Sequence, residues 1–380
     1  MRITLISKAL IVGAYQTKLE AIAAQPGVEL AVVVPPSWRV DGRIQRLEVI
    51  HTHGYRLITA PLVLNGSFHL HYYPTLGRIL RQTRPEICHI DEEPYNLATY
   101  LATVAACRLG AKPLFFTWQN LLRRYPWPFR AMEQYVYRQS MAAIAGNLEA
   151  VRVLRAKGYA GPVATIPQFG VDPELFKPAP ERPEGAFTIG YAGRLVEQKG
   201  LLVLLRALTL LPGEWHLAIC GSGPLQQVMQ TELNEHGLGD RVTFHQQIAS
   251  SKMPEFYKNL SVLVLPSLTR SNWKEQFGRV LIEAMACGVP VLGSTSGEIP
   301  HVIGAAGIVT PEGDAQALAN HLEVLRSDAD LQRKLGTAGR ERVLAHYTQA
   351  QIAKATVDVY RWLAEGAAEP AMWDTPREVL

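Results

Sequence analysis

The sequence predicts an α/β protein with two tandem domains, each built on a doubly wound parallel β-sheet. Short apolar runs of strand length alternate with segments of helical periodicity, which indicates βαβ units. The alternation stops at 177–185, a stretch rich in proline and charge, and then starts again. The chain has 380 residues, enough for two domains that each bury a core.

The first half is predicted to hold six strands with helices between them. The strands are expected at 3–6, 30–35, 86–90, 112–117, 142–147 and 162–168. A loop through Gly13 follows the first strand, and the spacing Thr17-x-x-Glu20 is typical of a capping box that opens a helix. These elements define a first domain over 1–176, followed by a linker at 177–185.

The second half repeats the alternation and defines a second domain over 186–351. Strands are expected at 187–193, 216–223 (with a turn), 241–245, 260–267 and 290–294, and helices at 201–208, 314–326 and 329–364. Parallel sheets of this kind bind ligands outside the carboxyl ends of their strands. We therefore expect the two sheets to face an interdomain cleft.

The composition is that of a globular protein, 48% hydrophobic and 19% charged, which excludes disordered and collagen-like chains. Residues 1–180 carry 20 Lys and Arg against 12 Asp and Glu, a net +8, whereas 181–380 carry 18 against 22, a net −4. A basic first half suits nucleic acid, an anionic lipid surface or an anionic acceptor, and a dispersed surface charge explains it equally well. No nucleic-acid-binding module is visible, so we expect no nucleic-acid partner.

The cysteines and the N-terminus favour a cytoplasmic protein. The four cysteines lie in apolar runs without metal-ligand or CxxC spacing, which indicates reduced, buried thiols. Lys8 interrupts the apolar N-terminus, so a first strand is predicted there and not a signal peptide. No uncharged apolar stretch reaches spanning length. Peripheral attachment to the inner face of the membrane is compatible with these features.

The most informative stretch runs from 266 to 304 and places Glu275 and Glu283 on either side of Phe277-Gly278. Glu275 is expected in a loop and Glu283 in the following helix. A glycine at a helix start lets an anion such as a phosphate approach the free N–H groups. Two carboxylates cannot both face that phosphate, so they are better placed to accept hydrogen bonds from hydroxyls beside it. A phosphate with a polyol on each side describes a nucleotide sugar.

A second cluster lies in the loop after the strand at 187–193, where Gly193, Arg194 and Lys199 occur together. Two fixed cations can neutralise a departing nucleoside diphosphate without a metal. Two solvated loop cations are the alternative interpretation. Gly221 opens a Gly-Ser-Gly-Pro turn after the next strand, which either shapes the nucleotide pocket or is an ordinary turn.

Together the segments GRLVEQKG, GSGPL, VLPS, EQFGRVLIEAMACGVPV and GEIP resemble family 4 glycosyltransferases with the GT-B fold, which has two Rossmann-like domains. The resemblance is close over about 187–350 and looser in the first half, at Glu93-Pro94 and in the segment 167–172. It implies a C-terminal domain that binds the nucleotide sugar and an N-terminal domain that binds the acceptor. It also implies that the C-terminal helix, about 352–380, packs back on the first domain.

The resemblance assigns roles by position. Arg194 and Lys199 would bind the donor diphosphate, and Glu275 would contact hydroxyls of the transferred sugar. Glu283 would take the ribose hydroxyls. The remaining donor contacts are implied for the backbone around Phe277 and Gly278 and for Gly13, which would sit in the N-domain loop that meets the phosphates. The predicted reaction is metal-independent transfer of a hexose, with retention of configuration, to a glycolipid, polysaccharide or small-molecule hydroxyl. No cofactor is expected.

Three features depart from the family pattern. The strand at 112–117 leads into Trp118-Gln119-Asn120 where a histidine is common, so Gln119 or Asn120 could bind a sugar hydroxyl but neither can take a proton. The usual double glycine near Gly13 is missing. Arg279 stands where an apolar residue is usual, and it would meet either a phosphate or a neighbouring carboxylate. A nucleotide-sugar epimerase on the same fold, or an inactive nucleotide-sugar-binding homologue, therefore stays open.

Two further segments of the basic half carry candidate contacts. Asp91 and Glu93 end the strand at 86–90, where they either orient an acceptor hydroxyl or simply suit a helix N-terminus. The segment 121–130 mixes arginines with aromatic residues, which is typical of a loop lying on an anionic bilayer. An ordinary loop whose aromatic side chains pack into the domain is the alternative.

Overall fold

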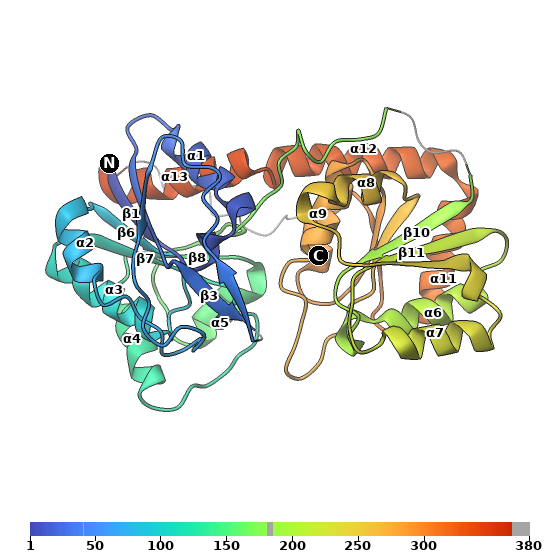
Figure 1. The fold of residues 1–380 in the computed structure, drawn as a ribbon, viewed down its shortest axis with the longest axis horizontal. Coiled ribbons are helices and arrows are strands. Elements are labelled where there is room, and N and C mark those ends of the chain that lie inside the picture. Colours follow the sequence, from blue (N-terminus) through green and yellow to red (C-terminus); the bar gives the residue numbers. More distant parts are fainter. Residues whose placement is uncertain (41, 181–184, 367–380) are drawn as a thin grey trace. The chain divides into compact units, whose positions relative to one another are not determined.

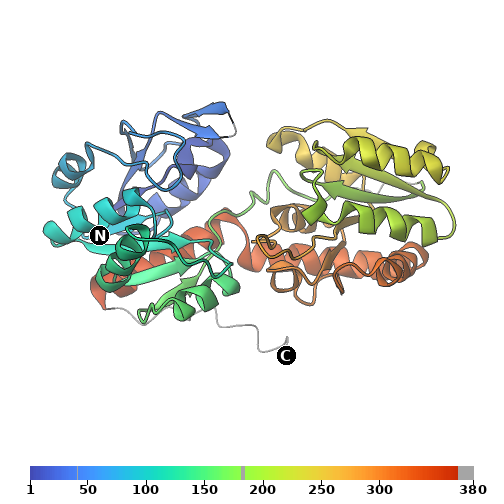
Figure 2. The same cartoon turned by 90° about the horizontal axis from the view of Figure 1, so that it is seen from below.

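The computed structural model describes residues 1–40, 42–180 and 185–366, which form two compact units (Figures 1 and 2). Unit 1 comprises Met1–Gly170 together with the chain from Gln349 onward, and unit 2 comprises Val171–Thr348. Each unit is a parallel β-sheet covered by helices on both faces. The predicted α/β class with two doubly wound domains is confirmed.

Unit 1 contains a seven-stranded sheet in the order β5-β2-β1-β6-β7-β8-β9, with every neighbouring pair parallel. The strands are β1 (Arg2–Ile6), β2 (Glu29–Val34), β5 (Arg56–Thr59), β6 (Ile87–Ile90), β7 (Lys112–Thr117), β8 (Ala142–Ala145) and β9 (Val163–Thr165). A separate antiparallel hairpin joins β3 (Ser37–Val40) to β4 (Arg43–Arg46). Strand β7 has the bounds that the sequence predicts.

Helices cover both faces of this sheet. They are α1 (Thr17–Ala23), α2 (Leu76–Thr83), α3 (Leu97–Arg108), α4 (Phe129–Gln139), α5 (Leu148–Ala156) and α13 (Gln349–Glu365). On one face, Leu5 packs with side chains of α1 and α13. On the other face, Ile6 packs with side chains of α2 and α3. Successive strand residues point to opposite faces, so one apolar strand serves two cores.

Unit 2 contains a six-stranded parallel sheet in the order β12-β11-β10-β13-β14-β15. The strands are β10 (Phe187–Ala192), β11 (Trp215–Cys220), β12 (Val242–His245), β13 (Val262–Leu265), β14 (Val291–Ser294) and β15 (Ile308–Thr310). The helices are α6 (Leu201–Leu210), α7 (Gln226–Glu235), α8 (Met253–Lys258), α9 (Arg279–Ala286), α10 (Ile299–Ile303), α11 (Ala315–Ser327) and α12 (Ala329–His346).

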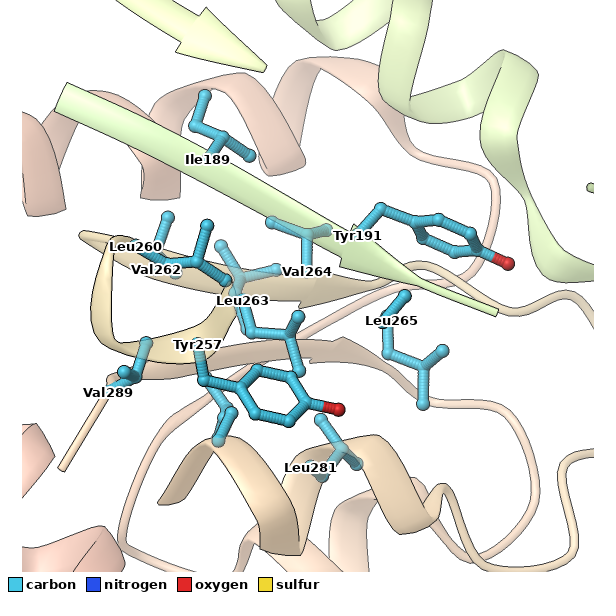
Figure 3. Close-up of a cluster of buried hydrophobic side chains, with 14 of the residues drawn as sticks. Ile189, Tyr191, Tyr257, Leu260, Val262, Leu263, Val264, Leu265, Leu281 and Val289 are labelled. Carbon is cyan, nitrogen blue, oxygen red and sulfur yellow. The ribbon is translucent and has the colours of Figure 1, made fainter. Parts of the chain in front are cut away.

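The core of unit 2 is centred on β10 and β13 and includes two buried tyrosines, Tyr191 and Tyr257. Figure 3 shows both rings among the aliphatic side chains of these strands, with their hydroxyls directed toward the carboxyl end of β13. The hydroxyls therefore lie at the edge of the core where ligands of such sheets bind.

The domain boundaries of the structure differ from the predicted ones. Val171 and Phe176 are buried in the core of unit 2, and the Val171 N–H donates to Tyr347 O at 2.9 Å. The boundary therefore lies after residue 170, not after 176. Of the predicted linker, 181–184 lie outside the described residues. Of the C-terminal stretch predicted at 352–380, residues 367–380 also lie outside them, whereas α13 packs on α1 of unit 1.

Two local predictions were wrong. The helix predicted over 329–364 is two helices, because the chain leaves the helical conformation at Tyr347 and Thr348 and enters unit 1 there. The capping box at Thr17 does not form. The N-cap of α1 is Gln16, and the Thr17 hydroxyl donates to Ala14 O at 3.3 Å.

Each sheet has one point where the strand order reverses. In unit 1 the first strand, β1, has β2 on one side and β6 on the other, and in unit 2 the first strand, β10, has β11 and β13. Such a switch point opens a crevice between the two loops that leave neighbouring strands in opposite directions. The sites below are built on the loops that follow these strands.

Candidate functional site

The loops after β10 and β13 are joined by an ion pair at the switch point of unit 2. Lys199 ends a short 3-10 turn after β10, and its Nζ donates to Glu275 Oε2 at 2.5 Å. The hydroxyl of Ser267, two residues after the end of β13, donates to the same oxygen at 2.8 Å. Lys199 Nζ also lies 5.1 Å from the centre of the Trp273 ring. An ammonium has three N–H donors, so this pairing leaves donors for a further anion.

Two glycines allow the backbone to close around Glu275. Gly278 precedes α9 with φ of 77°, a left-handed conformation that a residue with a side chain adopts only at a cost. At Gly297 a Cβ would lie 2.0 Å from Glu275 O, so the loop after β14 can touch the Glu275 backbone only as glycine. The N–H of Glu298 donates to that carbonyl at 3.1 Å. Loops after β10, β13 and β14 thus converge on Glu275.

Glu283 lies one turn into α9 and is held by two partners. Arg279 Nε lies 2.8 Å from Glu283 Oε1, and the Tyr257 hydroxyl donates to Oε2 at 2.7 Å. Burial raises the pKa of Glu283, and Arg279 and Tyr257 oppose that rise. Of the two partners predicted for Arg279, the structure shows the neighbouring carboxylate.

The other donor candidates lie around the same loops. Arg194 is exposed, and its carbonyl accepts a hydrogen bond from the Tyr191 hydroxyl at 2.8 Å. The Gly193 N–H donates to Cys220 O at 2.9 Å, and a Cβ on Gly221 would lie 1.9 Å from Gly193 O. The turns that follow β10 and β11 are therefore in close contact. The Phe277 ring packs edge-on against Tyr347, 5.7 Å between centres.

In unit 1, Gly13 lies in a short 3-10 turn after β1, and other groups of unit 1 occupy its surroundings. Its N–H donates to Glu48 Oε2 at 2.7 Å. A Cβ added there would lie 2.4 Å from the Ile50 side chain. The backbone donor predicted to meet a donor phosphate is thus bound by a carboxylate of unit 1.

The acidic run after β6 separates into three environments. The Ser7 hydroxyl donates to Asp91 Oδ2 at 2.8 Å, and burial raises the pKa of Asp91. Lys8 and His71 both lie 2.7 Å from Glu92 Oε2. Burial acts to raise the pKa of Glu92, but these two partners outweigh it and hold the pKa well below the usual range.

Glu93 is the third acid of this run and links β6 to β7. Its Oε2 accepts from the Thr117 hydroxyl at 2.6 Å, and its Oε1 accepts from the Trp118 N–H at 2.8 Å. Burial raises the pKa of Glu93 to about 7 in spite of these donors. As a whole residue Glu93 is half-buried, whereas Asp91 and Glu92 are buried.

Gln119 and Asn120 are both buried at the end of β7. Gln119 Oε1 accepts from Lys157 Nζ at 2.9 Å, and Lys157 also pairs with Glu133 at 2.6 Å. The Lys157 ammonium lies 4.7 Å from the centre of the Tyr125 ring. Gln119 therefore belongs to a packed polar network that fixes the loop before α4.

Comparison with known proteins decides the class of unit 2. Residues 172–342 match the family model of glycosyl transferases group 1. Over this segment the chain is similar to group 1 glycosyltransferases. The matched segment covers almost all of unit 2, and with it Lys199, Glu275 and Glu283.

Curated proteins that are similar to this segment differ in what they act on. The chain is 31% identical over 205 residues to a GDP-mannose-dependent alpha-(1-6)-phosphatidylinositol monomannoside mannosyltransferase of Mycolicibacterium smegmatis, covering 49% of this chain and 54% of that protein. It is 29% identical over 197 residues to a 2-deoxystreptamine N-acetyl-D-glucosaminyltransferase of Streptomyces fradiae, covering 49% and 44%. The chain thus spans about half the length of the curated relatives it matches.

Solved structures match both units. Sucrose-phosphate synthase from Thermosynechococcus elongatus superposes with a TM-score of 0.70 and 24% identity, over 96% of this chain and 99% of that one. Anabaena Alr3699/HepE in complex with UDP superposes with a TM-score of 0.72 and 18% identity, over 95% and 99%. These likenesses confirm the GT-B fold.

Several residues around the candidate sites belong to no recognisable sequence motif. Tyr257 looks like any apolar position of an amphipathic helix, and Glu48 lies in a segment with no motif. Ser267 could have been found, because it ends the VLPS segment that carries part of the family resemblance.

In the described part of the chain, no helix combines the length and hydropathy needed to cross a bilayer.

Proposed function

We propose that the protein is a family 4, retaining, metal-independent glycosyltransferase that moves a hexose from a nucleotide-diphosphate sugar to an acceptor hydroxyl. The observation that carries this proposal is the Lys199–Glu275 pair at the switch point of unit 2, beside the glycine that opens α9. It places a cation, a carboxylate and a helix N-terminus within one loop cluster. A diphosphate and the sugar attached to it need this combination.

Each group has a distinct task in this proposal. Lys199 and Arg194 neutralise the charge that develops on the leaving diphosphate, a task that otherwise falls to a metal. Glu275 fixes Lys199 and accepts hydrogen bonds from the sugar hydroxyls. The backbone at Gly278 admits the phosphate. Glu283, held by Arg279 and Tyr257, accepts hydrogen bonds from the ribose hydroxyls with its remaining lone pairs.

Retention of configuration follows from a reaction on one face of the sugar. The bond from the anomeric carbon to the β-phosphate oxygen breaks as the acceptor oxygen approaches from the same side. A β-phosphate oxygen takes the acceptor proton, so no second carboxylate is needed as nucleophile. The protein supplies position and charge.

Unit 1 is proposed to bind the acceptor, which is a glycolipid, a polysaccharide or a small molecule with a free hydroxyl. Asp91, Glu93, Gln119 and Asn120 follow β6 and β7 at the carboxyl edge of the sheet, where acceptor contacts are expected. We propose a cytoplasmic enzyme that attaches peripherally to the inner face of the membrane. At the membrane surface the enzyme would reach an acceptor that is linked to a lipid.

The proposal is tested by incubating the protein with UDP-glucose, GDP-mannose and ADP-glucose, each with and without a panel of glycoside acceptors. Acceptor-dependent release of one nucleoside diphosphate, with an α-linked product by NMR, is expected from these α-linked donors. A β-linked product would contradict retention. Donor conversion without acceptor would indicate an epimerase, and nucleotide binding without turnover would indicate an inactive homologue.

A further inference from the structure

Three loops follow the carboxyl ends of β2, β5 and β7 in unit 1, at 35–50, 60–72 and 118–130. The first includes the hairpin of β3 and β4, and the third includes the first two residues of α4. The first loop contacts the second, since the Arg39 N–H donates to Asn65 Oδ1 at 2.9 Å. The second loop meets the third through His69, whose ring centre lies 5.6 Å from that of Tyr125 and 5.5 Å from that of Phe129. The three loops therefore form one continuous surface, called here the arginine–apolar surface.

Large apolar side chains of this surface are exposed to an unusual degree. The exposed fractions are 49% for Val40, 57% for Ile44, 53% for Leu64, 45% for Phe68, 57% for Leu122 and 83% for Trp127. Single exposed apolar residues are normal on a soluble protein, but a contiguous group of them marks an interaction site. Trp127 in particular leaves almost its whole ring outside the domain.

The hairpin of β3 and β4 also exposes large apolar side chains, next to arginines. Its register pairs Arg39 with Ile44 and Val40 with Arg43, and all four residues are exposed. Because successive strand residues point to opposite faces, both faces of this hairpin present an arginine and an aliphatic side chain. Trp38 of β3 is buried and anchors the hairpin to unit 1, so the exposed part of the hairpin is β4 and the end of β3. Contact with a partner would cover the apolar side chains.

Basic residues dominate the charge of this surface. The three loops contain six arginines (Arg39, Arg43, Arg46, Arg123, Arg124 and Arg130), and each is exposed. They contain two acids, Asp41 and Glu48, and the carboxylate of Glu48 is bound to the Gly13 N–H. The surface is therefore strongly cationic where it is also apolar.

The combination of arginines and exposed apolar side chains indicates which class of partner fits this surface. Nucleic acid would use the arginines but not six exposed aliphatic and aromatic groups. A second copy of the chain would bury the apolar groups but would set one cluster of arginines against the other. The headgroup region of an anionic bilayer satisfies both, because tryptophan and aliphatic side chains enter the boundary of the acyl chains while arginines bind lipid phosphates.

We propose that the arginine–apolar surface docks unit 1 on an anionic lipid bilayer, with Ile44 and Trp127 inserted at the level of the headgroups and the arginines bound to lipid phosphates. Docking needs residues of unit 1 alone. Its consequence, delivery of a lipid-linked acceptor to the carboxyl edge of the sheet, rests on the proposed transfer reaction.

Co-sedimentation of the full chain with phosphatidylcholine vesicles, with and without phosphatidylglycerol, tests the proposal. Binding is expected only to the anionic vesicles and is expected to weaken at high salt. Each basic side chain near such a surface strengthens partitioning by roughly fivefold, so the triple variant Arg43→Glu, Arg46→Glu, Arg124→Glu is expected to bind at least about 100-fold more weakly. The pair Ile44→Ser and Trp127→Ser is expected to lose binding that high salt does not remove.

The matched control reverses three exposed arginines on the helices of unit 1, Arg78→Glu, Arg138→Glu and Arg152→Glu, with the same change in net charge. It is expected to bind within a few-fold of the native protein. Equal loss in both triple variants would show a general charge effect and overturn the proposal. Binding of neither lipid, or self-association through the surface in sedimentation without vesicles, would overturn it as well.

Release of nucleoside diphosphate, measured without vesicles in the same variants, separates this proposal from the proposed function. Vesicle binding without any donor turnover would leave the docking surface intact and count against the transferase. Donor turnover without vesicle binding would support the transferase and count against the docking surface.

Discussion

The two units carry the same kind of ion pair at the same topological place, and they differ in what surrounds it. Lys8 follows β1 and lies 2.7 Å from Glu92, which follows β6. Lys199 follows β10 and lies 2.5 Å from Glu275, which follows β13. Each pair therefore connects the two loops that diverge at the switch point of its sheet. The side chain of Glu92 is 0% exposed and that of Glu275 is 9% exposed.

The difference lies in how many partners each carboxylate has. Glu92 is bound by Lys8 and His71 at one oxygen, and the Tyr73 hydroxyl donates to the other at 3.3 Å. Glu275 receives the Lys199 and Ser267 donors at a single oxygen. A fully bonded carboxylate in the core fixes structure, whereas one bonded on a single oxygen at a loop edge can still accept from a ligand. We infer that the pair in unit 1 is structural and the pair in unit 2 functional.

The largest expected effect is on transfer. Lys199→Ala and Glu275→Ala should each lower kcat by about a thousandfold, because each removes a group fixed against the leaving diphosphate or its sugar. The measurement is initial rate of nucleoside diphosphate release under saturating donor and acceptor. Glu197→Ala, an exposed residue of the same turn, is the control and should retain activity. Normal rates in both site variants would break the assignment of function to unit 2.

The second effect is on the free energy of unfolding and concerns the Lys8–Glu92 pair of unit 1. Glu92→Gln should lower the free energy of unfolding by about 3 kcal/mol, since it removes the carboxylate that the fully buried His71 and the half-buried Lys8 share. Glu275→Gln, the matched change in unit 2, should cost less than about 1 kcal/mol, because Lys199 can turn toward water. Urea unfolding of both variants measures the difference. Equal losses would mean that the two pairs do not differ in role.

The third effect is a pH dependence that comes from Glu93. Its pKa rises on folding from 4.5 to about 7, so the folded state binds the proton more tightly than the unfolded state. The stability that this group contributes is fully present below about pH 4.5 and falls by about 3 kcal/mol as the pH rises to 7. Glu93→Gln should remove this fall from the stability–pH curve, while Glu174→Gln, an exposed control, should leave it in place. A curve unchanged by Glu93→Gln would contradict the raised pKa.

The smallest expected effect is that of a chelator. If Arg194 and Lys199 neutralise the diphosphate, then excess EDTA should change the transfer rate by less than about twofold. Restoring activity with Mg²⁺ or Mn²⁺ after a strong loss would show that the two cations are insufficient.

The local sequence placed the candidate residues of unit 2 next to one another more directly than those of unit 1. The motifs of unit 2 lie in loops next to their strands, so Lys199, Glu275 and Glu283 could be placed from spacing alone. The contacts of unit 1 join residues far apart in the chain. Glu48 covers Gly13 from 35 positions away, and Lys157 holds Gln119 from 38 positions away. No local pattern contains such pairs, because only the packing of the sheet brings them together.

The fold class and the positions of the strands could be predicted from the sequence, whereas the boundaries of the domains and of the last helices could not. Strand positions followed from apolar runs, since a strand buried on both faces is apolar throughout. The break between α12 and α13 was not predicted, because apolar periodicity continues across Tyr347 and Thr348 while the partner domain changes. The interdomain cleft, the retaining mechanism and metal independence stay predictions.

The central claim is that unit 2 binds a nucleoside diphosphate through Arg194, Lys199 and Glu283. Calorimetric titration of UDP, GDP and ADP, each without metal, tests it most directly in the native protein and in Glu283→Gln. The account predicts that one of the three binds in preference to the others and that Glu283→Gln weakens it at least about tenfold, a loss of about 1.4 kcal/mol. Absence of binding by all three, or equal affinity in Glu283→Gln, would contradict it.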